Sequence, residues 1–158
     1  MIEQPQIVQT SARPTAVIHV TVPREQIREV MGPTRGELMA ALAAQGIATA
    51  GPWFTHHLRI DPAVFDFELG VPVATPVTAA GRMAPGEIPA EAMARTVLYG
   101  GYEGLGAAWE EFDTWIVAQG YIPADDVWEC YLVGPESNSD AAEWRTELRR
   151  GITHLRTS

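Results

Sequence analysis

The tripeptide Ala-Gln-Gly occurs twice, ending at Gly46 and at Gly120, 74 residues later. Each copy closes an alanine-rich or strongly amphipathic stretch, and glycine is favoured just past the end of a helix. A tryptophan follows each copy, Trp53 after the first and Trp128 after the second, and two segments of strand composition follow each tryptophan. This agreement in helix end, tryptophan and element order indicates an internal duplication.

The duplication constrains the fold class. Each repeat reads as strand, helix, strand, strand, and two such units most simply build one curved antiparallel sheet with both helices packed on it, about a pseudo-twofold axis. We therefore predict an α+β fold. We place it in a single domain over 1–158, with repeat one at about 5–72, a loop rich in proline and glycine at about 70–89, and repeat two at about 90–152.

Individual elements follow from periodicity and turn residues. Thr34 with Glu37 three residues later is a capping-box pattern, which places the start of the first helix after Pro33. Apolar residues spaced three and four apart predict the second helix over 103–119, with Glu110, Glu111 and Asp113 on its solvated face. We expect strands at 7–10 and 15–22, joined tightly around Arg13, and at 53–60, 63–69, 91–99, 127–133 and 144–152.

Composition and charge exclude several classes of function. With 158 residues, 46% hydrophobic and 20% charged, the chain is typical of a soluble globular protein. A net charge of -9 repels a phosphate backbone, so we expect no direct binding of nucleic acid. No signal peptide and no membrane-spanning run are visible, which predicts a cytoplasmic protein. The single cysteine, Cys130, excludes an internal disulfide.

The sequence lacks the motifs of most catalytic and cofactor-binding sites. His56 and His57 point to opposite faces of a strand and cannot chelate one ion together, while His19 and His154 are isolated, so we predict no metal site. No glycine-rich phosphate loop is present, and we predict no cofactor. Cys130 has no histidine partner at motif level, and no nucleophile elbow exists.

The segment Trp128-Glu129-Cys130-Tyr131 remains. On a strand, Glu129 and Tyr131 share one face. Aligning the repeats on their tryptophans puts Phe54 and His56 at the equivalent places. We therefore predict a central depression with one carboxylate among aromatic walls, which suits a flat lipophilic cation. The alternative is that Glu129 lies on an exposed sheet face and pairs with a surface arginine.

Five segments in this order resemble the GyrI-like small-molecule-binding superfamily, which includes effector-binding domains of AraC-type and MerR-type multidrug regulators. They are Gly-Gly-Tyr-Glu-Gly-Leu (100–105), the helix ending at Gly120, Tyr-Ile-Pro (121–123), Trp-Glu-x-Tyr (128–131) and Arg-Thr-Glu-Leu (145–148). The strand over 13–23 and the stretch 66–72 are similar to the family's first half, so the resemblance covers about 5–152. Gly101 stands where family members commonly have proline.

The resemblance implies a pocket for hydrophobic, often cationic, compounds, in which the glutamate of Trp-Glu-x-Tyr, here Glu129, meets the ligand's positive charge. Since no DNA-binding segment is seen, we expect a stand-alone ligand-binding or sequestering protein, with a protein partner left open. The predicted ligand-binding residues are Glu129, Tyr131, Phe54, His56, Tyr99, Trp109 and Trp144.

An enzymatic alternative stays open. Some stand-alone members of the superfamily hydrolyse genotoxic compounds that carry a cyclopropane ring, and Glu129 would then be the acidic catalytic residue. A second carboxylate beside Glu129, from Glu68 or Glu103, would favour hydrolysis over capture. Alternation along the strand leaves the face of Glu68 undecided.

Overall fold

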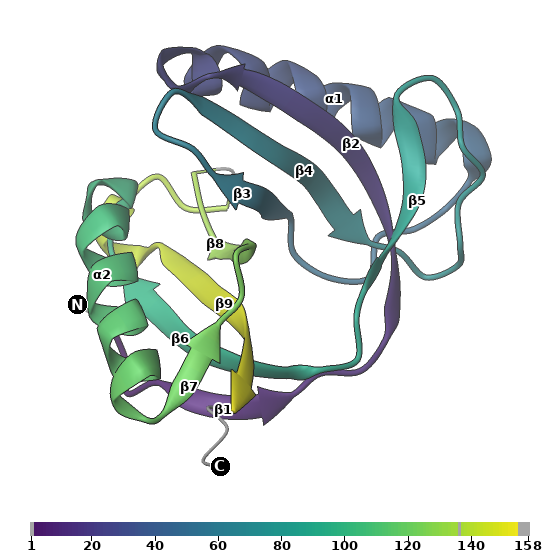
Figure 1. Ribbon diagram of the computed structural model, residues 1–158. Coiled ribbons are helices and arrows are strands. Elements are labelled where there is room, and N and C mark those ends of the chain that lie inside the picture. The colour runs from purple at the N-terminus through teal and green to yellow at the C-terminus, as the bar shows by residue number, and fades with distance from the viewer. Residues whose placement is uncertain (1, 136, 155–158) are drawn as a thin grey trace. The chain divides into compact units, whose positions relative to one another are not determined.

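The computed structural model describes residues 2–135 and 137–154, with the backbone alone at Ile60 and His154 (Figure 1). The chain divides into two compact units. The central unit is Ser11–Ala90, and the terminal unit combines the start of the chain up to Thr10 with the chain from Glu91 onward. Each unit has an antiparallel sheet and one long helix, which confirms the predicted α+β class with two helix-bearing repeats.

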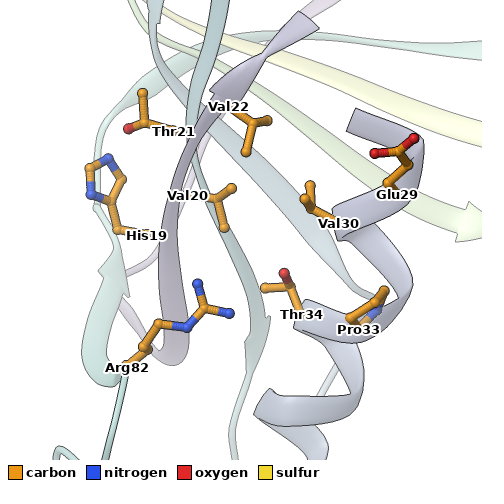
Figure 2. A pocket seen from close by; sticks show the side chains of 9 residues that line it. All are labelled: His19, Val20, Thr21, Val22, Glu29, Val30, Pro33, Thr34 and Arg82. Carbon is orange, nitrogen blue, oxygen red and sulfur yellow. The ribbon is translucent and has the colours of Figure 1, made fainter. Parts of the chain in front are cut away.

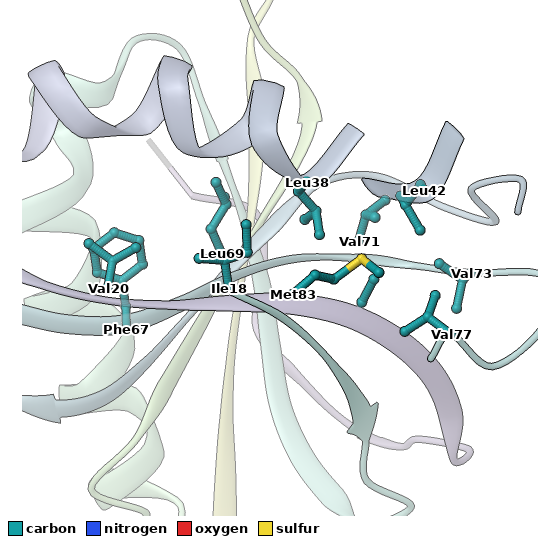
Figure 3. Close-up of a cluster of buried hydrophobic side chains, with 11 residues drawn as sticks. Ile18, Val20, Leu38, Leu42, Phe67, Leu69, Val71, Val73, Val77 and Met83 are labelled. Carbon is teal, nitrogen blue, oxygen red and sulfur yellow. The ribbon is translucent and has the colours of Figure 1, made fainter. Parts of the chain in front are cut away.

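The central unit contains a four-stranded sheet in the order β3-β4-β2-β5. One helix, α1 (Ile27–Gln45), packs on it, and Leu38 and Leu42 bury their side chains against the sheet (Figure 3). Alternate residues of β2 and β4, including Ile18 and Leu69, form the sheet side of this core. The strands are β2 (Arg13–Pro23), β3 (Phe54–Ile60), β4 (Val64–Pro72) and β5 (Met83–Ile88).

The predicted start of the first helix is wrong. A short 3-10 turn, η1 (Arg24–Gln26), leads into α1 at Ile27, and Thr34 is a buried residue inside the helix rather than its cap. Proline inside a helix costs about 3 kcal/mol. Val30 and Met31 pack against the core from the turns before Pro33, and this burial offsets the cost. The helix ends at Gly46 in the left-handed conformation, φ 64°, as predicted.

The terminal unit has the sheet order β1-β6-β9-β8, with the short β7 paired to the far end of β9. Its helix, α2 (Leu105–Ala118), follows a 3-10 turn, η2 (Tyr102–Gly104), and buries Phe112 and Ile116 against Leu98 and Leu148. Its strands are β1 (Gln6–Gln9), β6 (Ala92–Tyr99), β7 (Tyr121–Pro123), β8 (Val127–Val133) and β9 (Arg145–His154), with a 3-10 turn, η3 (Ala141–Glu143), before β9.

β1, the first strand of repeat one, lies in the sheet of the terminal unit, while β5, which precedes repeat two, lies in the sheet of the central unit. β1 pairs with β6 and not with β2, and β5 pairs with β2. The short connection predicted between β1 and β2 is present, at 10–12, although these strands do not pair with each other. The predicted loop at about 70–89 is wrong for 83–88, which form β5. β5 contains Pro85, which has no N–H to give to a ladder, and an edge strand tolerates this loss.

The pairing register also corrects the alignment of the repeats. Glu129 lies opposite Leu148, which packs against α2. In the central unit Thr55 lies opposite Leu69, which packs against α1. Thr55 is therefore the counterpart of Glu129, which agrees with the 74-residue spacing of Gly46 and Gly120 and not with the spacing of the tryptophans. A slip of one residue moves every side chain to the other face of a strand.

None of the helices in the described ranges is long and apolar enough to cross a membrane.

Candidate functional site

The Glu129 carboxylate accepts two hydrogen bonds from aromatic side chains. The indole Nε1–H of Trp109 donates to Oε2 over 2.7 Å, and the Tyr131 hydroxyl donates to Oε1 over 3.2 Å. Trp109 comes from the second turn of α2, while Glu129 and Tyr131 are two residues apart on β8 and share the face toward α2. Both donors are neutral, so these contacts orient the carboxylate without cancelling its charge.

Further aromatic rings continue from Tyr131. The ring of Tyr102 meets that of Tyr131 edge-on at 5.9 Å between centroids, and the ring of Trp144 at 4.9 Å. We call these five residues, Glu129, Trp109, Tyr131, Tyr102 and Trp144, the Glu129 cluster. Four of them were predicted as site residues, and Tyr102 was not. It lies in the Gly-Gly-Tyr-Glu-Gly stretch that carries part of the family resemblance, and that position was the available signal.

A buried hydroxyl adjoins the cluster. Thr146 is fully buried on β9, directly opposite Tyr131 and on the same face. Its Oγ has no hydrogen-bond partner among the residues that the structure describes. An unsatisfied buried hydroxyl costs about 1–3 kcal/mol.

Tyr99, also predicted as a site residue, lies on the other face of the terminal sheet. Leu98 packs against α2, and Tyr99 therefore points away from that helix. Its hydroxyl donates to Glu3 Oε2 over 2.7 Å, and the guanidinium of Arg145 lies 4.6 Å from its ring centroid. The structure does not bring Tyr99 together with the Glu129 cluster.

Phe54 and His56 belong to the central unit and lie on the face of β3 away from α1. Phe54 is buried and sits opposite Gly70. His56 lies opposite Glu68, with 3.5 Å between Nδ1 and Oε1, so the face of Glu68 that the sequence left undecided is the one it shares with His56. The neighbouring His57 points the other way and contacts the ring of Phe67 at 5.5 Å between centroids.

The face of the terminal sheet opposite the Glu129 cluster carries a buried ion-pair network. Glu147 contacts the guanidinium of Arg95 and, at 2.6 Å, that of Arg149. Cys130 lies directly opposite Glu147 on β8. Burial, with a smaller contribution from the Glu147 charge, raises the pKa of the Cys130 thiol to about 12.

We expect Cys130 to be inert in the folded protein. At pH 8 a thiol with a pKa of about 12 has about a thousandfold less thiolate than an ordinary cysteine, and only the thiolate attacks alkylating reagents. Iodoacetamide should therefore leave the native protein unmodified over hours, as measured by intact mass. Labelling should be rapid in about 6 M guanidinium, where the chain is unfolded. Rapid labelling of native protein would contradict the assigned burial.

Two grooves lie elsewhere. One, of about 280 Å³, runs between β2 and α1 in the central unit (Figure 2). The other, of about 220 Å³, lies between the segment from Ile2 to Pro5 and two residues of α2, Glu111 and Trp115. Neither is lined by a member of the Glu129 cluster.

In the described part of the chain, no three His, Cys, Asp or Glu side chains are grouped as metal ligands would be.

Comparison with solved structures shows the fold. The crystal structure of the EcmrR C-terminal domain superposes with a TM-score of 0.85 at 21% identity, covering 96% of this chain and 98% of that one. The cryo-EM structure of the EcmrR–DNA complex in EcmrR-RPo contains a chain that superposes with a TM-score of 0.84 at 22% identity. The match covers 96% of this chain but only 58% of that one. SAV2435 bound to tetraphenylphosphonium gives 0.68 at 12% identity, covering 96% and 94%.

A search among curated proteins gave no match. Residues 3–149 match the family described as GyrI-like small molecule binding domain. That match spans both repeats and includes the whole Glu129 cluster. The chain therefore belongs to the GyrI-like family of small-molecule-binding domains.

Proposed function

We propose that this protein binds lipophilic cations at the Glu129 cluster. The observation that carries the proposal is a half-buried carboxylate held by two neutral aromatic donors, the Trp109 indole and the Tyr131 hydroxyl. The carboxylate supplies a negative charge, and the surrounding rings supply apolar surface and the negative faces of their π systems.

The physical basis is the low polarity around the charge. A cation over an aromatic face gains about 0.5–2 kcal/mol, with the larger values at desolvated sites. A carboxylate partly removed from water attracts a cation more strongly than an exposed one, because less water screens the interaction. A lipophilic cation loses little hydration on entering, whereas a small hydrated ion loses much, so the cluster selects large organic cations.

Two further findings support the proposal. SAV2435, which shares the fold, has been solved bound to tetraphenylphosphonium, a large aromatic cation. The hydroxyl of Thr146, opposite Tyr131 on the same face, has no hydrogen-bond partner among the described residues and adds a polar atom beside the cluster. The predicted residues Phe54, His56 and Tyr99 are not needed by the proposal in this form, because the five residues of the cluster all lie in the terminal unit.

Glu129→Gln is the direct test. It keeps the size of the side chain and its acceptor oxygen and removes the charge. Loss of a partly buried charge partner costs about 2–5 kcal/mol, so we expect binding of tetraphenylphosphonium to weaken about 30-fold or more. Binding is measured by calorimetry or by quenching of tryptophan fluorescence, since Trp109 touches the carboxylate.

Two controls make this result specific. Glu110→Gln removes the same charge from an exposed position on α2 and should change the affinity less than twofold. Tetraphenylborate has the same shape and the opposite charge, and its affinity should not fall in Glu129→Gln. Equal losses for both ions would contradict a role of the charge. Turnover of a cyclopropane-bearing alkylator by wild type and not by Glu129→Gln, seen as a water adduct by mass spectrometry, would favour the hydrolytic alternative instead.

A further inference from the structure

Strand β2 has an edge that β5 covers only in part. β5 pairs with residues 13–18 of β2, and the chain enters β5 opposite Ile18 from a turn in which Gly81 has φ 59°. Residues 19–23 of β2 pair with β4 on one side. On the other side, no strand of the described chain pairs with them. An uncovered edge presents unpaired backbone N–H and C=O groups and favours the addition of another strand.

The groove of Figure 2 runs along this uncovered edge. One wall is β2, with Val20 and Val22 directed toward α1, and the other wall is the first half of α1, with Val30. Its volume of about 280 Å³ is enough for a short run of side chains. The edge itself is held in place by Asp66 on β4, which accepts a hydrogen bond from Thr21 over 3.2 Å and lies 2.5 Å from His19.

The helix wall also contains a proline. Pro33 lies within α1 and has no N–H, so the carbonyl of Glu29 loses the donor that a regular helix would supply. Glu29 and Pro33 both line the groove, next to the buried residue Thr34. A ligand rich in backbone N–H and C=O groups would pair with the open strand edge, and an extended peptide is such a ligand.

Charge specifies the kind of peptide. The exposed carboxylate of Glu29 stands at the groove wall, while Arg82, the one arginine lining it, is held by Glu37 at 2.7 Å. The chain as a whole carries a net charge of -9. We propose that this groove binds an extended, basic segment of a partner protein. The segment adds a strand to residues 19–23 of β2. Its apolar side chains pack on the valines, and a lysine or arginine lies near Glu29.

The test uses a fluorescein-labelled hexapeptide with valine at positions 1 and 3, lysine at position 5 and threonine between them, so that the valines and the lysine share one face of the added strand. Fluorescence anisotropy measures the affinity, and hydrogen exchange locates the binding site. We expect saturable binding and slower amide exchange over residues 19–22, since Pro23 has no amide hydrogen. Glu29→Lys should weaken binding about fivefold or more, the scale of one exposed ion pair. Glu110→Lys changes the net charge equally from an exposed position in the other unit, and we expect less than a twofold effect. Glu129→Gln should leave peptide binding unchanged. The test of peptide binding is therefore independent of the test of cation binding.

Several outcomes would overturn the proposal. One is equal affinity for the same peptide with N-methyl groups on alternate backbone nitrogens, because N-methylation blocks strand addition. Exchange protection confined to segments other than 19–23 is another, and so are equal losses for Glu29→Lys and Glu110→Lys. Concentration-dependent dimers seen by light scattering, with protection of 19–23 that the peptide does not compete for, would show that a second copy occupies the edge.

Discussion

Glu147→Ala is expected to lower the free energy of unfolding by about 3–5 kcal/mol. The side chain of Glu147 is 6% exposed, and it pairs with Arg95 on β6 and with Arg149 on its own strand. Arg95 also contacts Glu3 at 3.2 Å, so Glu147 is the buried centre of a network that joins the N-terminal segment to two strands. Removing Glu147 takes away the partner of Arg149 and one of the two partners of Arg95, and loss of a buried partner costs more than the pair itself contributes.

Urea unfolding followed by tryptophan fluorescence measures the effect. Glu147→Gln keeps the volume and the hydrogen-bond acceptor, so it should lower the free energy of unfolding by less than Glu147→Ala does. Glu143→Ala changes an exposed glutamate in the turn before β9 and should stay within about 0.5 kcal/mol of wild type. A loss below about 1 kcal/mol for Glu147→Ala would mean that water replaces the carboxylate and that the site is not dry.

Gly70→Ala is expected to destabilise the central unit by about 2–3 kcal/mol, the usual cost of overpacking. A Cβ at this position would lie 2.6 Å from Cζ of Phe54, 2.8 Å from Cγ1 of Val17 and 3.0 Å from the carbonyl oxygen of Ala16. Side chains can turn aside, but the carbonyl belongs to the β2–β4 ladder and cannot move without breaking it. The space above Gly70 is filled from both neighbouring strands.

The double variant Gly70→Ala with Phe54→Leu separates this cause from a general loss of strand structure. Leucine has no atom at the place of Cζ, so part of the loss should be recovered, and the two changes should be non-additive by about 1 kcal/mol. Gly106→Ala on α2 is the matched control, because a Cβ there meets nothing within 4 Å. Alanine is the better helix former, and we expect Gly106→Ala to be neutral or slightly stabilising. Strict additivity of the first pair would contradict the packing explanation.

Elements with a strong local signal were predictable. The second helix, the strand at 127–133 and the shared face of Glu129 and Tyr131 follow from periods of 3.6 and 2 that burial enforces along one element. Trp109 lies on the apolar side of the helix that the period of 3.6 predicts. It was predicted as a site residue, and it donates a hydrogen bond to Glu129.

The failures share a different origin. Pro33 and its flanking glycines, Gly32 and Gly36, indicate a break by every local rule, yet α1 continues through them because Val30 and Met31 have a core to pack on. β5 reads as a loop until β2 supplies its partner. Aligning the repeats on their tryptophans chose the wrong register, since identical residues can occupy opposite faces when the connection before them changes by one residue.

By itself, the sequence determined the duplication, the α+β class, the family resemblance and the carboxylate on which binding is proposed to depend, because each of these rests on the order and spacing of residues along the chain. Only the tertiary structure decided which strand pairs with β1, which residue matches Glu129, and that Tyr102 joins the cluster while Tyr99 turns away from it. Those outcomes depend on pairing between segments far apart in the chain. The free energy of such pairing comes from burial and hydrogen bonds that no single segment contains.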